Sequence, residues 1–262
     1  MDMVTSRDGT PIAYETAGSG PAIVFTTGAF NDHSTAAPLA AALADGFTVV
    51  TYDRRARGAS GDTRPYAIER EVEDLAVVIG TTGGPAAVFG FSSGAVLALR
   101  AAADGLPITH LFLYEAPFAA DGAVRKDDLP ARLQALIDGS EPGEAVSLFQ
   151  SEGIGLPPEL VAQIRQSPMF GALTAIAQST VYDATLTTEH ARPSGAMAAV
   201  TTPTLVMTGA QTWPVLAAAA RDLTATLPNA RRVEVEGGEN HGIAPGPTAA
   251  VIRGFLTVDN LA

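Results

Sequence analysis

The stretch VFGFSSGAVLAL, residues 88–99, most constrains the fold, because an apolar run is interrupted by small residues and then resumes. Gly90 and Gly94 flank Ser92 in the pattern G-x-S-x-G. This pattern is typical of a sharp turn from a strand into a helix that holds a serine hydroxyl at the top of a sheet. A strand that ends in an ordinary small-residue turn is the simpler alternative, and the rest of the chain has to decide between them.

Short apolar runs alternate with helical patterns along the chain, which indicates a parallel sheet with helices on both faces. A hairpin precedes a buried strand at residues 22–26, and the next buried strand ends at Asp53. Further strands are expected in AAVFGF, HLFLYEAP, PTLVMTGA and RRVEVE, which makes a mostly parallel sheet of eight strands. An amphipathic helix is expected where apolar residues recur at helical spacing, at Ile68, Val72, Leu75, Ala76 and Ile79.

The strand pattern is interrupted once, over residues 119–200, where helix-like pieces are broken by Pro and Gly. This insertion follows the sixth expected strand and divides an α/β core into residues 1–118 and 201–262. Ligands bind at the carboxyl ends of the strands in open α/β sheets. We therefore expect the insertion to cover the site as a helical lid. The alternative is that it only thickens the domain.

Composition limits the partners and the compartment. The chain has 262 residues, of which 47% are hydrophobic and 17% charged, and this suffices for a substantial core. Its net charge of −12 argues against nucleic acid or an anionic membrane as a partner. The lack of cysteine excludes disulfides, thiolate catalysis and cysteine metal sites. The N-terminus lacks the pattern of a signal peptide and no apolar run is long enough to span a bilayer, so a cytoplasmic protein is expected.

The order of four motifs resembles the α/β-hydrolase superfamily. TTGAF follows one expected strand, YDRRARGAS the next, GFSSGA the elbow strand and GGENHG the last strand. The resemblance covers nearly the whole chain outside the insertion, and it implies an α/β-hydrolase fold. GFSSGA with a glutamate after the following strand is also similar to the zearalenone-lactonase branch of the superfamily, which hydrolyses a macrocyclic lactone.

The nucleophile and the base that this resemblance implies are Ser92 and His241. Ser92 is the central serine of the elbow, and a serine hydroxyl needs an adjacent base to become a good nucleophile. His241 lies in the Gly-flanked loop after the last strand, where the superfamily carries its base. Of the other three histidines, His110 opens a strand at the wrong end of the sheet and His190 lies in the insertion. His33 follows the TTGAF loop and is a candidate substrate contact, with a surface or capping role as the alternative.

An oxyanion hole requires two N–H donors aimed at the developing negative charge. One is expected at Ser93, whose N–H lies at a helix N-terminus. The second donor is expected in the loop TTGAF, where many relatives carry His-Gly and this chain has Thr27-Gly28. Alignment of these two residues assigns the donor to the Ala29 N–H, and Gly28 is a candidate substrate contact. The segment DRRARGAS, residues 53–60, is expected to buttress the elbow, and an anion-binding site built on its arginines is the alternative.

The acid is missing from its commonest position in the superfamily, a Gly-x-x-Asp after the strand PTLVMTGA. Residues 209–212 are Gly-Ala-Gln-Thr and carry no carboxylate. Glu115 ends the strand after the elbow helix, a position that some α/β-hydrolases use, and a carboxylate there can reach the histidine. Asp183 in the insertion is a weaker candidate. A structural role for Glu115, or the loss of catalysis altogether, is the alternative.

The resemblance implies a serine hydrolase that cleaves an ester or lactone through an acyl-enzyme, with Ser92, His241 and Glu115 as its triad and with no metal or cofactor. The apolar insertion predicts a small, hydrophobic, uncharged substrate. Five apolar or aromatic side chains are candidates for the pocket wall: Phe149, Met169, Phe170, Tyr182 and Trp213. A lyase or acyl transferase with the same triad, and a ligand-binding protein on a hydrolase frame, remain alternatives. The oligomeric state, monomer or homodimer, stays open.

Overall fold

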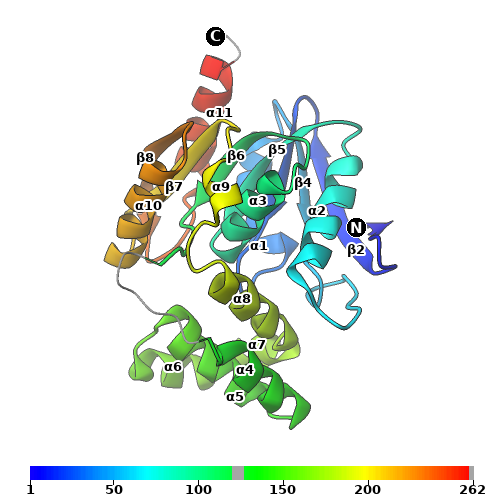
Figure 1. Ribbon diagram of the computed structural model, residues 1–262, viewed down its shortest axis with the longest axis vertical. Helices are drawn as coiled ribbons and strands as arrows, with labels where there is room; N and C mark the ends of the chain where they lie inside the picture. Colours follow the sequence, from blue (N-terminus) through cyan, green and yellow to red (C-terminus); the bar gives the residue numbers. More distant parts are fainter. Residues whose placement is uncertain (120–126, 260–262) are drawn as a thin grey trace.

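The computed structural model describes residues 1–119 and 127–259, which are organised around one eight-stranded sheet (Figure 1). The strands lie side by side in the order β1-β2-β4-β3-β5-β6-β7-β8. β1 and β2 are antiparallel to their neighbours, and β4, β3, β5, β6, β7 and β8 are parallel. The predicted mostly parallel sheet is therefore confirmed. The strand bounds are β1 Asp2–Thr5, β2 Pro11–Gly18, β3 Ala22–Thr26, β4 Thr48–Tyr52, β5 Ala86–Phe91, β6 Ile108–Tyr114, β7 Thr204–Gln211 and β8 Ala230–Glu239.

Helices cover both faces of the sheet, because its central strands bury side chains in both directions. On β3, Val24 packs toward the helices α2, α3 and α10, while Ile23 and Phe25 pack toward α1 and α11. This alternation follows from the two-residue period of a strand. The helices of the two faces are α2 Ile68–Gly80, α3 Ser93–Ala103 and α10 Pro214–Thr226 on one side, and α1 His33–Leu43 and α11 Pro245–Asp259 on the other.

The amphipathic helix expected near residues 68–79 is α2, with one difference in its buried face. Val78 is fully buried there, whereas Ala76 is only half-buried. The apolar stripe of α2 therefore follows positions 68, 72, 75, 78 and 79, a spacing of three and four residues.

Helices fill the described part of the predicted insertion, and residues 120–126 of that insertion lie outside the described residues. In Figure 1 the helices α4, α5, α6 and α7 group apart from the sheet, with α8 between them and the core. The helix bounds are α4 Leu129–Asp138, α5 Pro142–Leu148, the π-helix η1 Phe149–Ile154, α6 Pro158–Arg165, α7 Phe170–Ala175, α8 Gln178–Glu189 and α9 Gly195–Ala198.

Two hydrophobic clusters meet at α8. Tyr182 and Ala184 pack with α4, α5 and η1 in a small core of the helical segment. Leu186 of α8 and Met197 of α9 pack instead into the large cluster beside α2 and α3. The C-terminal end of α8 and α9 are therefore attached to the sheet layer, while α4, α5, η1 and the first half of α8 form a helical layer.

Within residues 1–119 and 127–259, each helix falls short of the combination of length and apolar character that crossing a bilayer requires.

Candidate active site

The turn at Ser92 connects β5 directly to α3. Ser92 has φ 55° and ψ −125°, a backbone conformation that is costly for a residue with a side chain. Flanking glycines make the turn possible, because a Cβ at Gly90 would lie 2.5 Å from Ala95 Cα, and one at Gly94 would lie 2.2 Å from the Thr26 carbonyl oxygen. The two glycines thus permit the strand–turn–helix geometry that G-x-S-x-G predicts.

Three predicted side chains come together at the carboxyl ends of β5, β6 and β8. His241 Nε2 lies 3.1 Å from Ser92 Oγ, and His241 Nδ1 lies 2.5 Å from Glu115 Oε2. The other Glu115 oxygen accepts a hydrogen bond of 2.9 Å from the Gly209 N–H. With a proton on Nδ1, the imidazole donates to Glu115 and leaves Nε2 free to accept the Ser92 proton.

Glu115 occupies a buried and unusual position. Its side chain is fully buried, and its φ of 50° turns the chain sharply after β6. Gly209, where the common Gly-x-x-Asp acid motif would begin, supplies a backbone donor to Glu115. The carboxylate that reaches His241 therefore directly follows β6, while β7 contributes only an N–H.

The His241 ring is held by the loop that follows β8. His241 has φ 63°, and the Gly242 N–H donates to the Glu239 carbonyl at 2.9 Å. The ring contacts the Trp213 ring at a centroid distance of 5.3 Å and the Phe91 ring at 4.9 Å. These contacts restrict the imidazole to orientations that keep both nitrogens near Ser92 and Glu115.

A cavity of about 470 Å³ opens in front of Ser92. Ala29 and Ser93, the expected oxyanion donors, line it together with Ser92 and His241. Because Ser93 is the first residue of α3, its N–H has no acceptor within the helix and lies at the positive end of the helix dipole. The structure thus brings both expected donors to the cavity that holds the nucleophile candidate.

The walls of this cavity come from two layers. The sheet layer contributes Trp213 and Leu216, and the helical segment contributes Phe149, Ile154 and Thr187. Of the five predicted aromatic or apolar wall residues, Phe149 and Trp213 lie here. Sequence reasoning missed the remaining wall residues, because neither motif nor apolar character indicates that a side chain faces a cavity: Asn31, Phe91, Pro117, Phe118, Ala119, Glu152, Gly153, Ile154, Gly155, Thr187, Val215 and Leu216.

The sequence pattern of the alpha/beta hydrolase family matches residues 23–252. The chain belongs to this family.

Two solved structures and one sequence relative are similar to this chain. An alpha/beta hydrolase from Sphaerobacter thermophilus DSM 20745 is 46% identical, with a TM-score of 0.90 over 97% of this chain and 100% of that chain. An enol-lactonase from Burkholderia xenovorans LB400 is 21% identical, with a TM-score of 0.74 over 98% of this chain and 100% of that chain, and shows the same fold. The uncharacterized hydrolase YraK of Bacillus subtilis (strain 168) is 39% identical over 95 residues, and the match spans 35% of each chain.

Three predicted wall residues of this alpha/beta hydrolase lie elsewhere, so their assignment to the pocket is wrong. Met169 is 68% exposed, and Phe170 packs beside Gly143 under the Arg165 guanidinium. Tyr182 is buried, stacks on Tyr66 at 4.0 Å, and donates its hydroxyl hydrogen bond to Asp62. Apolar character alone did not distinguish a pocket wall from a helix surface or an interior ring.

The two candidate substrate contacts near the oxyanion loop also have other roles. His33 donates its backbone N–H to Asp53, and its Nδ1 lies 2.8 Å from the same carboxylate oxygen. Partial burial acts to lower the pKa of His33, but the hydrogen bond and charge of Asp53 outweigh this effect and raise it. Gly28 lies against the nucleophile, since a Cβ there would be 2.7 Å from Ser92 Cβ. Gly28 therefore provides space for Ser92 rather than a wall for substrate.

Asp183, the alternative acid, lies in a buried ion cluster and not beside His241. It accepts hydrogen bonds from Arg57 Nη2 at 2.7 Å and from Arg54 Nη1 at 2.9 Å. Burial acts to raise the pKa of Asp183, but the charges of Arg57 and Arg54 outweigh this and hold it below its usual range. Arg55 pairs with Asp74 at 2.7 Å and 2.8 Å. Because carboxylates already occupy these guanidinium groups, the anion-site alternative for residues 53–60 is wrong.

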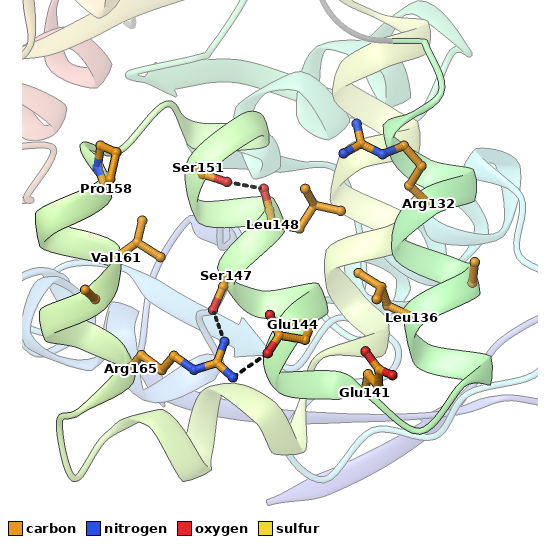
Figure 2. Close-up of a pocket in the computed structure, with 12 residues that line it drawn as sticks. Arg132, Leu136, Glu141, Glu144, Ser147, Leu148, Ser151, Pro158, Val161 and Arg165 are labelled. Atoms are coloured by element: carbon orange, nitrogen blue, oxygen red, sulfur yellow. Dashed lines mark hydrogen bonds and ion pairs between the residues drawn. The ribbon is translucent and has the colours of Figure 1, made fainter.

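A second and larger cavity, about 1000 Å³, lies within the helical segment (Figure 2). Its walls come from α4, α5, η1 and α6. Figure 2 shows Arg165 between two residues of α5, where it donates to Ser147 Oγ at 3.2 Å and also pairs with Glu144. The π-helix η1 separates the cavities, since Ser151 faces the larger one and Phe149 the cavity at Ser92.

Proposed function

We propose that this alpha/beta hydrolase is a serine hydrolase that cleaves a carboxylic ester or lactone of a small apolar substrate through an acyl-enzyme. One observation carries the proposal: hydrogen bonds run from Ser92 Oγ through both nitrogens of His241 to the buried Glu115. Membership of the hydrolase family supports an enzyme. The geometry supports the class of reaction.

In the first step, Ser92 Oγ attacks the carbonyl carbon while His241 Nε2 takes the hydroxyl proton. The resulting imidazolium carries its positive charge beside the Glu115 carboxylate, which orients the ring and stabilises the charge. The carbonyl oxygen becomes negative and accepts hydrogen bonds from the Ala29 and Ser93 N–H groups. Preorganised donors of this kind stabilise the transition state by ~3–4 kcal/mol each.

Collapse of this intermediate breaks the bond to the alkoxy oxygen, which takes the proton from His241 and leaves. Water then attacks the acyl carbon, and His241 accepts the proton of that water before returning one to Ser92. A lactone follows the same steps, except that its alcohol remains attached to the acyl group. The products are a carboxylic acid and an alcohol, or a hydroxy acid from a lactone.

The cavity supports the proposed substrate class. A volume of about 470 Å³ lies within the range typical of small-molecule sites. Phe149, Ile154 and Trp213 give it apolar walls, which favour an uncharged acyl or alcohol group. Two of these three residues belong to η1, so we infer that the helical segment acts as a lid that selects substrates.

Labelling with a fluorophosphonate, followed by assays with p-nitrophenyl esters and aryl lactones, tests this function. We expect labelling and turnover in the wild-type protein, and the loss of both in Ser92→Ala, by about 10⁴-fold or more in kcat. Mass spectrometry of the products distinguishes hydrolysis from lyase or acyl-transfer chemistry. Absence of both label and turnover in the wild-type protein would refute the proposal and favour a ligand-binding role.

A further inference from the structure

The Gly28–Ala29 peptide links the oxyanion loop to a buried arginine. In a trans peptide the carbonyl of one residue and the N–H of the next lie in one plane and point in opposite directions. Arg57 Nη1 donates a hydrogen bond of 2.5 Å to the Gly28 carbonyl oxygen. The direction of the Ala29 N–H is therefore set by the guanidinium on the other side of the same peptide.

The preceding peptide is held in the same way. Arg54 Nη1 donates to the Thr27 carbonyl at 3.1 Å and to Ser93 Oγ at 3.2 Å. Two consecutive carbonyls thus accept hydrogen bonds from two buried guanidinium groups. This arrangement fixes the loop on one side and leaves Ala29 on the wall of the cavity at Ser92.

Asp183 of α8 holds both arginines in place. Besides its bonds to Arg57 and Arg54, it accepts a hydrogen bond of 2.7 Å from Ser93 Oγ. Glu71 of α2 binds Arg54 from another side, at 2.6 Å and 2.7 Å. All these side chains are buried, where charges are costly unless they are fully paired. The cluster connects the helical segment to both expected oxyanion donors.

We propose that Arg57 is a positioning residue for the oxyanion hole: it fixes the plane of the Gly28–Ala29 peptide so that the Ala29 N–H points at the oxygen that becomes negative, and Asp183 holds Arg57 in that position. The inference rests on the proposed function. A cationic donor on the carbonyl also polarises the amide, which makes the Ala29 N–H a stronger donor.

Arg55 provides a matched control. It belongs to the same turn and is equally buried, but it donates to Asp74, to Asp8 and to the Arg70 carbonyl. Its partners lie on α2 and in the loop after β1, away from the oxyanion loop. Arg55→Gln therefore disrupts the ion pairs with Asp74 and Asp8, Arg57→Gln disrupts the ion pair with Asp183, and only Arg57→Gln releases the Gly28 carbonyl.

The experiment measures kcat and KM with p-nitrophenyl acetate, the inhibition constant of an aryl boronic acid, and the midpoint of thermal unfolding. The boronate forms a tetrahedral adduct with Ser92 and uses the oxyanion hole. For Arg57→Gln we expect kcat to fall about 10- to 100-fold, which is less than the loss caused by removing an oxyanion donor outright. The boronate inhibition constant should rise by the same factor, and KM should change little. Arg55→Gln should lower the unfolding midpoint comparably but keep kcat within about threefold.

Equal kcat values for the two variants, or a loss confined to KM, would overturn the inference while leaving the proposed function intact. A wild-type protein without label or turnover would instead remove the proposed function and this inference with it. If Arg57→Gln does not fold, Arg57→Lys is measured in the same way. One ammonium cannot match the planar fork that binds Gly28 and Asp183 together, so we expect an intermediate loss in kcat. Wild-type values of kcat and of the boronate constant in that variant would contradict the inference.

Discussion

The larger cavity, within the helical segment, is an open groove. It differs from the cavity at Ser92 both in size and in the side chains that line it. The groove has about twice the volume, 1000 Å³ against 470 Å³. Two of its charged side chains, Arg165 and Glu144, pair with each other at the surface. The cavity at Ser92 instead holds the Ser92 hydroxyl, the His241 imidazole and the two residues expected to supply oxyanion donors, and the buried Glu115 carboxylate contacts the imidazole.

The comparison teaches that the convergence of polar groups, and not volume, marks the candidate site. In the cavity at Ser92 these groups come from the ends of different strands, which a parallel sheet brings to one edge. The groove lies between helices of one segment, and its lining residues are near one another in the sequence. Four predictions test this distinction, beginning with the largest expected effect.

Glu115→Gln tests whether the buried carboxylate makes the smaller cavity reactive. The amide keeps the size of the side chain but cannot stabilise an imidazolium or fix the correct tautomer. We expect kcat to fall roughly 10²- to 10⁴-fold, with the fold retained. Steady-state kinetics and circular dichroism measure the two effects. Asp183→Asn is a comparison that acts on the oxyanion loop only through Arg57 and Arg54, so it should lower kcat no more than Arg57→Gln does. Nearly full activity of Glu115→Gln would show that the acid is misplaced.

Ile154→Asn and Val161→Asn compare the two cavities directly. Both residues are β-branched and half-buried, but Ile154 faces Ser92 and Val161 faces the groove. In Ile154→Asn we expect kcat/KM for a butyrate ester to fall about tenfold relative to the acetate ester, because apolar wall contacts discriminate by roughly 1–3 kcal/mol. In Val161→Asn the ratio should stay at the wild-type value. A larger change in Val161→Asn would assign substrate selection to the groove.

Ser93→Ala distinguishes the role of the Ser93 backbone N–H from that of the Ser93 hydroxyl. The variant keeps the Ser93 N–H but removes the hydrogen bonds of Oγ with Asp183 and Arg54. We expect kcat to fall by less than about tenfold, since Asp183 retains its two guanidinium partners. Fluorophosphonate labelling should persist. A loss as large as that of Ser92→Ala would contradict the assignment of the nucleophile.

Arg165→Ala should have the smallest effect. Its guanidinium is exposed and joins α6 to α5 across the groove. Exposed ion pairs contribute little to stability, so the unfolding midpoint should hardly change, and kcat/KM should stay within about twofold. Assays with acetate and butyrate esters check this. A change in ester preference would connect the groove to the substrate path.

The sequence alone determined the fold class of this protein. It also predicted the three side chains that meet at the candidate site, Ser92, His241 and Glu115. The elbow is predictable because Gly90 and Gly94 complete the G-x-S-x-G pattern, although only Gly90 is required by residues of the turn itself, and Gly94 is required by Thr26 of β3. The parallel sheet follows from apolar periodicity, and the edge that carries Glu115 and His241 follows from the direction of the strands. These features follow from short sequence patterns, so they can be predicted from the order of residues.

Only the tertiary structure decided how the pocket and the ion cluster are built. Phe149 faces Ser92 while Met169 is exposed, although both are apolar residues of the same segment. Asp183 meets Arg54, 129 positions away in the chain, and this pairing removed it as a candidate acid. Periodicity indicates that a side chain is buried, but not against which partner. The packing of α8 between the two layers makes that choice, because it brings a carboxylate from the helical segment to the arginines behind the oxyanion loop.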